Sequence, residues 1–332
     1  FSDGCNHICY EFRTGEHCRY KPASNKRGLY FSNLWSAYTL FPSREAKGYG
    51  LLKNSIDENG KAFGEHQLNY FDPATRKYVL ACDIHSANAV LESDSDKILM
   101  WGLDNEWELP VDYSPEAKDA FRLWLERLYS GDLTKLNLIW KSDFKAFSEV
   151  DPPGLDGYKS QPGPWLEWRR FQEEAYTDFI VERFKAVTAA DPLHRPAVAK
   201  STQCTIEMCA VAKRRLNNHE ILAAKARETS QGWYAIDMYG HGDRNSYETN
   251  YLSCCIRPDS PSDKSWTGVF FAETNNHAGP GWQFAQTFWR MLANGAKGFN
   301  FFCLGQWGAS WDGATFAFTS PIDGSRRSRY YY

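Results

Sequence analysis

Long apolar runs are missing from this sequence, and no stretch approaches the roughly 18 apolar residues needed to cross a bilayer. A charged start followed by a short apolar segment is also missing, so no signal peptide is recognised. Lys and Arg are scattered and the formal net charge is only −3, so neither nucleic acid nor a membrane is an expected partner. The absence of G-x-G-x-x-G and G-x-x-x-x-G-K-[ST] argues against a doubly wound nucleotide-binding sheet.

Cysteine is present nine times, but never as a C-x-x-C pair. This argues against a zinc ribbon and against a thioredoxin-type site. Cys5, Cys9 and Cys18 could form a disulfide in an exported protein, whereas Cys303 lies in an apolar strand and is expected to be a small buried hydrophobe. We therefore expect an extracellular or exported protein.

The chain has 332 residues, of which 42% are hydrophobic and 16% aromatic. It is long enough for a sizeable core, and with no internal repeat or low-complexity tract it is expected to form one domain, residues 1–332. The aromatic side chains could stack on sugar rings or fill a large core, and composition alone leaves both open.

Short apolar segments alternate with helical patterns, which is typical of a parallel α/β fold. One helix is predicted after Ser114-Pro115-Glu116, a second at about 165–190, and a third from near Trp282 to Asn294-Gly295. We predict a (β/α)8 TIM barrel, with an open doubly wound sheet as the alternative. The seven predicted strands are 5–12, 27–35, 97–103, 195–201, 232–239, 267–273 and 298–304.

Two carboxylates follow apolar strands directly, Glu106 and Glu273. In a barrel both would project into the same mouth, because active sites form at the C-terminal ends of the strands. Paired carboxylates suit glycosidic bond cleavage, in which one protonates the leaving oxygen and the other attacks the anomeric carbon or activates water. The alternative is that each glutamate begins a solvated loop.

Polar and aromatic neighbours favour the catalytic interpretation. Asn105 can hydrogen-bond a sugar hydroxyl next to the reacting carbon, and Tyr239 could hold a nucleophilic carboxylate ionised. Trp307 could form an apolar floor under the sugar. Asn33 and Trp35, at the end of the 27–35 strand, complete this group of predicted substrate contacts.

Several longer segments of the chain form a recognisable series, namely WGLDNEW (101–107), LTKLNLIWKSDFKAFSEVDPPG (133–154), FFAETNNHAGPGW (270–282) and FWRMLANGAKGFNFFCLGQW (288–307). In this order they resemble glycoside hydrolase family 42, the β-galactosidases of a large retaining clan built on (β/α)8 barrels. The resemblance implies that Asn105-Glu106 is the pair whose Glu is the acid/base and that Glu273 is the nucleophile. It also implies the sixth-strand tyrosine at Tyr239, the eighth-strand tryptophan at Trp307, and a further substrate contact at Trp140.

The chain also departs from the family pattern. Trp107-Glu108 stands where the family has an aromatic residue and a glycine, and the cysteine cluster with which some members bind zinc is absent, so we expect neither a metal nor another cofactor. Agarases of family 50 share a similar Asp-Asn-Glu pattern, so the motif leaves the sugar open.

By this register the 5–12 strand is the second of the barrel, and the last barrel helix would begin where the sequence stops. The chain is therefore expected to be a fragment of a longer polypeptide that binds carbohydrate, and it could assemble with the remaining part or as a homo-oligomer. The alternative is a non-catalytic structural or glycan-binding barrel. A site blocked by Trp107 or by a loop at 241–265 would favour that alternative.

Overall fold

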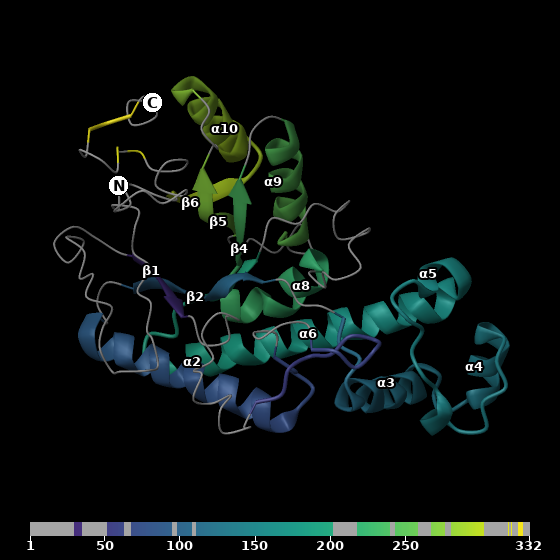
Figure 1. Cartoon of the computed structure of the whole chain (residues 1–332). Helices are drawn as coiled ribbons and strands as arrows, with labels where there is room; N and C mark the ends of the chain where they lie inside the picture. The colour runs from purple at the N-terminus through teal and green to yellow at the C-terminus, as the bar shows by residue number, and fades with distance from the viewer. Residues whose placement is uncertain are drawn as a thin grey trace.

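The computed structural model describes residues 30–34, 52–62, 68–94, 98–107, 111–201, 218–239, 243–257, 267–275 and 280–301, together with 318, 320 and 325–327 (Figure 1). Strands and helices alternate along most of this length. The elements are β1 (Tyr30–Leu34), α2 (Pro73–Asp94), β2 (Ile98–Trp107), α3 (Pro115–Leu128), α4 (Leu133–Trp140), η2 (Phe147–Glu149), α5 (Gly157–Ser160), α6 (Pro162–Ala190), β3 (Ala197–Ser201), α8 (His219–Ser230), β4 (Trp233–Tyr239), α9 (Asp243–Cys255), β5 (Gly268–Asn275), α10 (Gly281–Ala293) and β6 (Ala296–Phe301).

These strands form one parallel sheet in the order β1-β2-β3-β4-β5-β6. Each strand therefore neighbours the next one along the chain, as in a (β/α)8 barrel, whereas a doubly wound sheet reverses its order at a switch point. Within the described residues β1 and β6 do not pair with each other, so the predicted barrel is seen as an open run of six barrel-type strands. The strand predicted at 5–12 lies outside the described residues, and the missing first strand stays a prediction.

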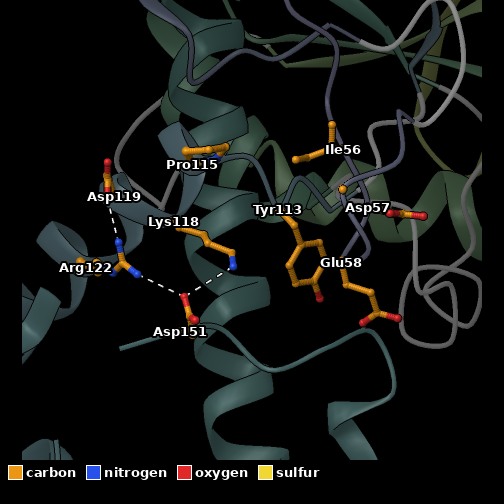
Figure 2. A pocket seen from close by; sticks show the side chains of 10 residues that line it. Ile56, Asp57, Glu58, Tyr113, Pro115, Lys118, Asp119, Arg122 and Asp151 are labelled. Atoms are coloured by element: carbon orange, nitrogen blue, oxygen red, sulfur yellow. Dashed lines mark hydrogen bonds and ion pairs between the residues drawn. The ribbon is translucent and has the colours of Figure 1, made fainter. Parts of the chain in front are cut away.

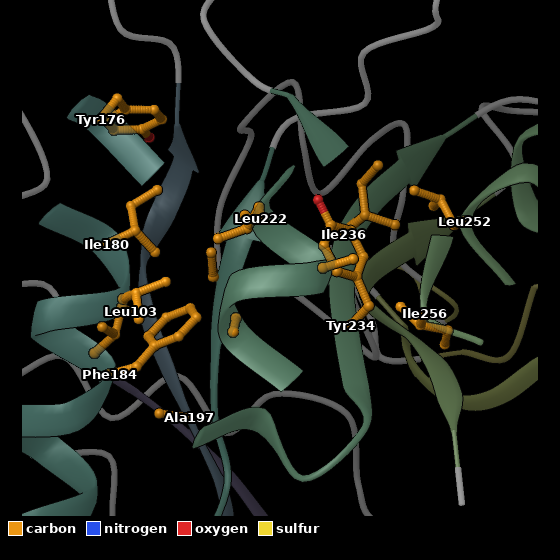
Figure 3. Close-up of a cluster of buried hydrophobic side chains, with 14 of the residues drawn as sticks. Leu103, Tyr176, Ile180, Phe184, Ala197, Leu222, Tyr234, Ile236, Leu252 and Ile256 are labelled. Carbon is orange, nitrogen blue, oxygen red and sulfur yellow. The ribbon is translucent and has the colours of Figure 1, made fainter. Parts of the chain in front are cut away.

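The sheet is buried on both faces. On one face Leu103, Ile236 and Phe271 contribute to a large hydrophobic cluster with residues of α2, α6, α8, α9 and α10 (Figure 3). The opposite face holds a smaller cluster made only of strand residues, namely Met100, Val198, Ala235, Phe270 and Ala272, with Trp233 against it. We call the residues of these two faces the helix-facing row and the inner row. Burial on both sides explains why the strands are apolar without strict alternation.

The helices predicted from start and stop signals are confirmed. Ser114 caps α3 by accepting a hydrogen bond from the Ala117 amide, and Pro115 occupies the first turn. α6 extends from Pro162 to Ala190. α10 ends at Ala293, with Asn294 as its C-cap and Gly295 after it at φ +113°.

The segment 241–265 differs from the expectation of a loop, because it contains a helix, α9, over Asp243–Cys255. The helix sequence, DRNSYETNYLSCC, shows no clear apolar stripe. Leu252 and the following Ile256 reach the main cluster, while small polar residues such as Thr249 and Ser253 fill the rest of the buried side. Tertiary packing rather than an amphipathic pattern therefore determines this helix.

A helical excursion separates β2 from α6 and contains α3, α4, η2 and α5 (Figure 1). It is held to α6 by edge-on and tilted aromatic rings, with Phe121 4.7 Å from Trp168 and 5.3 Å from Phe171 between ring centroids. Part of the high aromatic content therefore serves a core and not a sugar site.

α2 and α6 lie side by side along the helix-facing side of the sheet (Figure 1). A fully buried ion pair joins them, in which Arg183 donates from Nε and Nη2 to the two oxygens of Asp83 over 2.6 and 2.8 Å. Among the helices that the structure describes, none is both long and apolar enough to span a bilayer.

Candidate active site

The predicted acid Glu106 lies near the C-terminal end of β2. The ladder pairs Trp107 with Ser201, and Ser201 with Ile236, which belongs to the helix-facing row. Between Leu103 and Trp107 the register of β2 shifts, because four residues of β2 span two residues of β3. Position 106 lies in this irregular stretch, directly before the last residue of the strand.

The predicted nucleophile Glu273 lies in β5 at a break in the strand register. Ile236 pairs with Phe271, but the next pair is Asp237 with Glu273, so β5 contains one extra residue. Ala272 belongs to the inner row, and strict alternation would send position 273 to the helix-facing row. The extra residue is a β-bulge, and through it position 273 pairs with Asp237 of β4.

Asp237 and Tyr239 end β4 on the same side as Ala235. Asp237 is fully buried, and Tyr239 is half-buried at the last position of the strand. The sequence interpretation included Tyr239 but did not select Asp237 as a site residue. The signal was present, since an acid between Ile236 and Met238 interrupts an apolar strand two residues before the tyrosine.

The inner row below these residues is tightly filled. Trp233 and Phe270 meet edge to face with ring centroids 6.1 Å apart. Gly298 pairs with Phe270, and a Cβ on Gly298 would lie 2.6 Å from the Phe270 ring. Glycine is needed here because the aromatic ring occupies the space of a side chain. The candidate site therefore has a solid apolar floor.

The chain that leaves β2 is anchored by α6. Gln172, buried in α6, accepts a hydrogen bond from the Asp112 amide over 3.1 Å and donates one to the Asp112 carbonyl over 2.8 Å. The Asp112 carboxylate accepts hydrogen bonds from the amides of Ile56 and Ser114, although burial raises the pKa of this carboxyl. The segment six residues after Glu106 is thus fixed to both α6 and the 52–62 segment.

A second polar anchor lies at the opposite end of the same strands. Asp191 accepts hydrogen bonds from Trp101 Nε1 over 2.9 Å and from Arg195 Nε over 2.7 Å. Burial alone would raise the pKa of Asp191, but the hydrogen bonds from Arg195, Trp101 and the Leu193 amide outweigh it and lower the pKa to about 2. Asp191 therefore stays ionised and ties α6 to β2.

The structure brings together only part of the predicted site. Four predicted residues lie at the C-terminal ends of β2, β4 and β5, namely Asn105, Glu106, Tyr239 and Glu273. Asn33 lies in β1, where it pairs with Gly102 of β2. Trp35 and Trp307 lie outside the described residues.

Trp140 does not lie with these residues at the strand ends, and its assignment as a substrate contact stays a prediction. It lies in α4, where its Nε1 donates to Glu167 over 3.0 Å and its ring stacks near Phe121 at 6.3 Å. Figure 1 shows α4 at the margin of the excursion, well away from β4, β5 and β6. Trp140 therefore closes the small aromatic core of the excursion.

A pocket of about 360 Å³ opens beside α3, between that helix, the 52–62 segment and Asp151 (Figure 2). Its charged groups bind one another: Lys118 lies 3.5 Å from Asp151, and Arg122 contacts Asp119 at 2.8 Å and Asp151 at 3.1 Å. None of its described lining residues belongs to the predicted site. Within the residues that the structure describes, no group of three or more His, Cys, Asp or Glu could hold a metal ion.

Comparison with known proteins points to one family. The family model Glyco_hydro_42, described as "Beta-galactosidase", matches residues 52–327. A β-galactosidase from an Arthrobacter species is 30% identical over 199 residues, which cover 55% of this chain and 28% of that protein. The solved β-galactosidase of Halorubrum lacusprofundi superposes with a TM-score of 0.70 at 18% identity, covering 91% of this chain and 47% of that one.

An exo-β-agarase structure is also similar in fold, with a TM-score of 0.54 at 13% identity over 92% of this chain and 39% of the agarase. This chain spans less than half of the length of each of these three proteins. The structural matches support a (β/α)8 barrel fold for the chain as a whole.

Proposed function

This chain belongs to glycoside hydrolase family 42, the β-galactosidase family, and from that membership we propose that it is the barrel part of a retaining glycoside hydrolase. Its substrates are β-galactosides or related β-glycans. The reaction is a double displacement that needs two carboxyl groups on opposite sides of the scissile bond and no other cofactor.

Glu273 is the proposed nucleophile. Its carboxylate attacks the anomeric carbon and forms a glycosyl ester, while the Glu106 carboxyl gives its proton to the departing glycosidic oxygen. In the second step Glu106, now a carboxylate, takes a proton from water. That water attacks the anomeric carbon, releases the sugar with its original configuration and frees the Glu273 carboxylate.

The observation that supports these roles is the β5 bulge. Through it, Glu273 pairs in register with Asp237 of the inner row, and Glu106 belongs to the C-terminal end of β2 in the same sheet. A strand without the extra residue would direct position 273 toward the helices, where a carboxylate would meet Phe299 and other apolar side chains. β-Bulges next to active sites commonly re-aim a side chain in this way.

The remaining predicted contacts surround the two acids. Asn105 hydrogen-bonds the sugar hydroxyl next to the reacting carbon, where such bonds strengthen in the transition state. Tyr239 donates a hydrogen bond to the Glu273 carboxylate, which favours its ionised form. Trp307 provides an aromatic floor, and Asn33 and Trp35 contact the far side of the sugar.

The test is a panel of aryl β-glycosides, β-linked galactans and agarose oligosaccharides, assayed with the full-length polypeptide. We expect hydrolysis of aryl β-galactosides, with the β-anomer as the first product by proton NMR. The α-anomer as first product would contradict the retaining mechanism, and carboxyl groups nearer 9 than about 5 Å apart would then be expected.

Two other outcomes would select the alternatives. Cleavage of agarose oligosaccharides without cleavage of aryl β-galactosides would indicate an agarase-like enzyme. Binding of glycans without any turnover would indicate the non-catalytic, glycan-binding barrel.

A further inference from the structure

The bulge in β5 is visible from both neighbouring strands. On the β4 side, Ile236 pairs with Phe271 and the next pair is Asp237 with Glu273, so one step along β4 corresponds to two along β5. On the β6 side, Phe271 pairs with Phe299 and the next pair is Thr274 with Phe301, so three steps along β5 correspond to two along β6. Both ladders therefore place the extra residue of β5 between Phe271 and Thr274.

A bulge disrupts the regular ladder and leaves a backbone group without its usual strand partner. At this bulge the carbonyl oxygen of Ala272 accepts a hydrogen bond from a side chain, Nδ2 of Asn300 in β6, over 2.9 Å. Ala272 is fully buried, and a buried carbonyl without a partner would cost about 1–3 kcal/mol. The Asn300 amide thus satisfies the bulged residue directly before Glu273.

Asn300 reaches this carbonyl from the inner row. Gly298, two residues earlier in β6, faces the Phe270 ring of the inner row, whereas Phe299 stacks on Phe271 of the helix-facing row at 5.4 Å. By alternation Asn300 lies on the same side as Gly298, one layer nearer the strand ends. Asn300 is half-buried in an otherwise apolar strand, and its hydrogen bond to the Ala272 carbonyl explains why a polar residue stands there.

We propose that Asn300 is a positioning residue that holds the β5 bulge and thereby sets the place of Glu273. This inference rests on the proposed role of Glu273 as nucleophile. Asn300 acts through the backbone of Ala272 and not on the sugar. Loss of its amide lets the bulge relax, and the reacting carboxylate then moves relative to the anomeric carbon. A displacement of the order of 1 Å can cost about a hundredfold in rate.

The experiment compares Asn300→Leu, which has similar size but no donor, with Asn300→Gln, which keeps an amide. Asn294→Ala is the matched control, because Asn294 Nδ2 also donates to a backbone carbonyl, that of Arg290 over 2.8 Å, but at the end of α10. If Asn300→Leu does not fold, Asn300→Asp carries the test, since it keeps the shape and removes the donor.

Two readouts are measured on the full chain. Hydrogen exchange of peptides covering 268–275 should become faster in Asn300→Leu and remain unchanged in Asn294→Ala. With an aryl β-galactoside, kcat of Asn300→Leu should fall by about ten- to a hundredfold with KM within about twofold of the parent, and Asn300→Gln should recover part of kcat.

The outcomes separate this inference from the proposed function. A raised KM with unchanged kcat would make Asn300 a substrate contact and overturn the proposal, as would unchanged exchange at 268–275. If the parent protein hydrolyses no glycoside, the proposed function fails by itself, and hydrogen exchange still decides whether Asn300 holds the bulge.

Discussion

Asp237 and Glu273 are paired residues at the C-terminal ends of β4 and β5. The preceding pair is Ile236 with Phe271, so a regular ladder would have paired Asp237 with Ala272. Asp237 is fully buried, and its strand neighbour Tyr239 is half-buried. The backbone register thus brings two acidic positions and a tyrosine to one point of the sheet. Substitutions at this point and in the structure beneath it should have distinct, measurable effects.

The two glutamates should be distinguishable by the products that azide forms. In Glu273→Ala, turnover of an aryl β-galactoside should fall by about a thousandfold or more, and azide should restore part of it with an α-galactosyl azide, because a single displacement inverts. In Glu106→Ala, azide should attack the glycosyl ester and give the β-galactosyl azide. Glu126→Ala, on the exposed side of α3, is the control and should keep parent activity.

Either glutamate variant with parent kcat on this substrate would remove that residue from the mechanism. A β-azide from Glu273→Ala would exchange the two roles. Product configuration is read by proton NMR, so the result does not depend on the absolute rate.

Gly298 should tolerate no side chain. The Cβ of Gly298→Ala would lie 2.6 Å from the Phe270 ring, which is itself held by Trp233, so we expect a loss of about 1–3 kcal/mol in the free energy of unfolding. Gly163→Ala, in the first turn of α6, is the matched control, because its Cβ would meet no neighbouring group within 4 Å. It should be neutral or stabilising by about 0.4–1 kcal/mol. Urea unfolding measures the stability of both variants. Equal unfolding midpoints for Gly298→Ala and Gly163→Ala would contradict the close packing of Gly298 against Phe270.

Removing only one member of the Asp83 and Arg183 ion pair should lower the stability of the protein much more than replacing both members. Their side chains are 0% and 1% exposed, so Asp83→Ala leaves the buried guanidinium without its carboxylate and should cost about 3–5 kcal/mol. The double variant Asp83→Leu/Arg183→Met should be much closer to the parent, since it removes both charges.

The exposed pair Lys225 and Asp178 is the control for this comparison, and Asp178→Ala should cost less than about 1 kcal/mol. Thermal unfolding of the four proteins checks the order. A double variant less stable than Asp83→Ala would show that the ion pair itself stabilises the contact of α2 with α6.

Asp191 should make stability depend on pH in the acid range. Its pKa is lowered from 3.8 to about 2, so the unfolded chain binds a proton more readily than the folded one. Its contribution, about 2 kcal/mol, is fully present above the unfolded pKa and is lost as pH falls from about 4 to about 2. Asp191→Asn should be less stable than the parent at pH 7, and the difference should shrink at pH 3. A constant difference between these two pH values would contradict the shifted pKa.

Local patterns in the sequence were sufficient for most elements. Ser114 and Pro115 start α3 and Asn294-Gly295 ends α10, because capping and left-handed glycine depend on residues within one turn. The apolar segments from 27–35 onward all contain strands, since burial on both faces requires continuous apolar runs. By contrast α2 and α8 were not identified, and α9 was taken for a loop. Their buried faces include polar residues such as Thr75, His219 and Thr249, which interrupt the apolar stripe that predicts a helix.

The sequence by itself determined the family, the parallel barrel-type strands and the choice of Glu106 and Glu273 as candidates, because each depends on residue types at short spacing. The tertiary structure alone decided how the ends of the strands pair. A bulge in β5 lets Glu273 pair with Asp237, and packing between helices places Trp140 in the aromatic core of the excursion. A bulge is defined by the pairing of neighbouring strands and an aromatic contact by distant helices, so neither is written in the periodicity of a single segment.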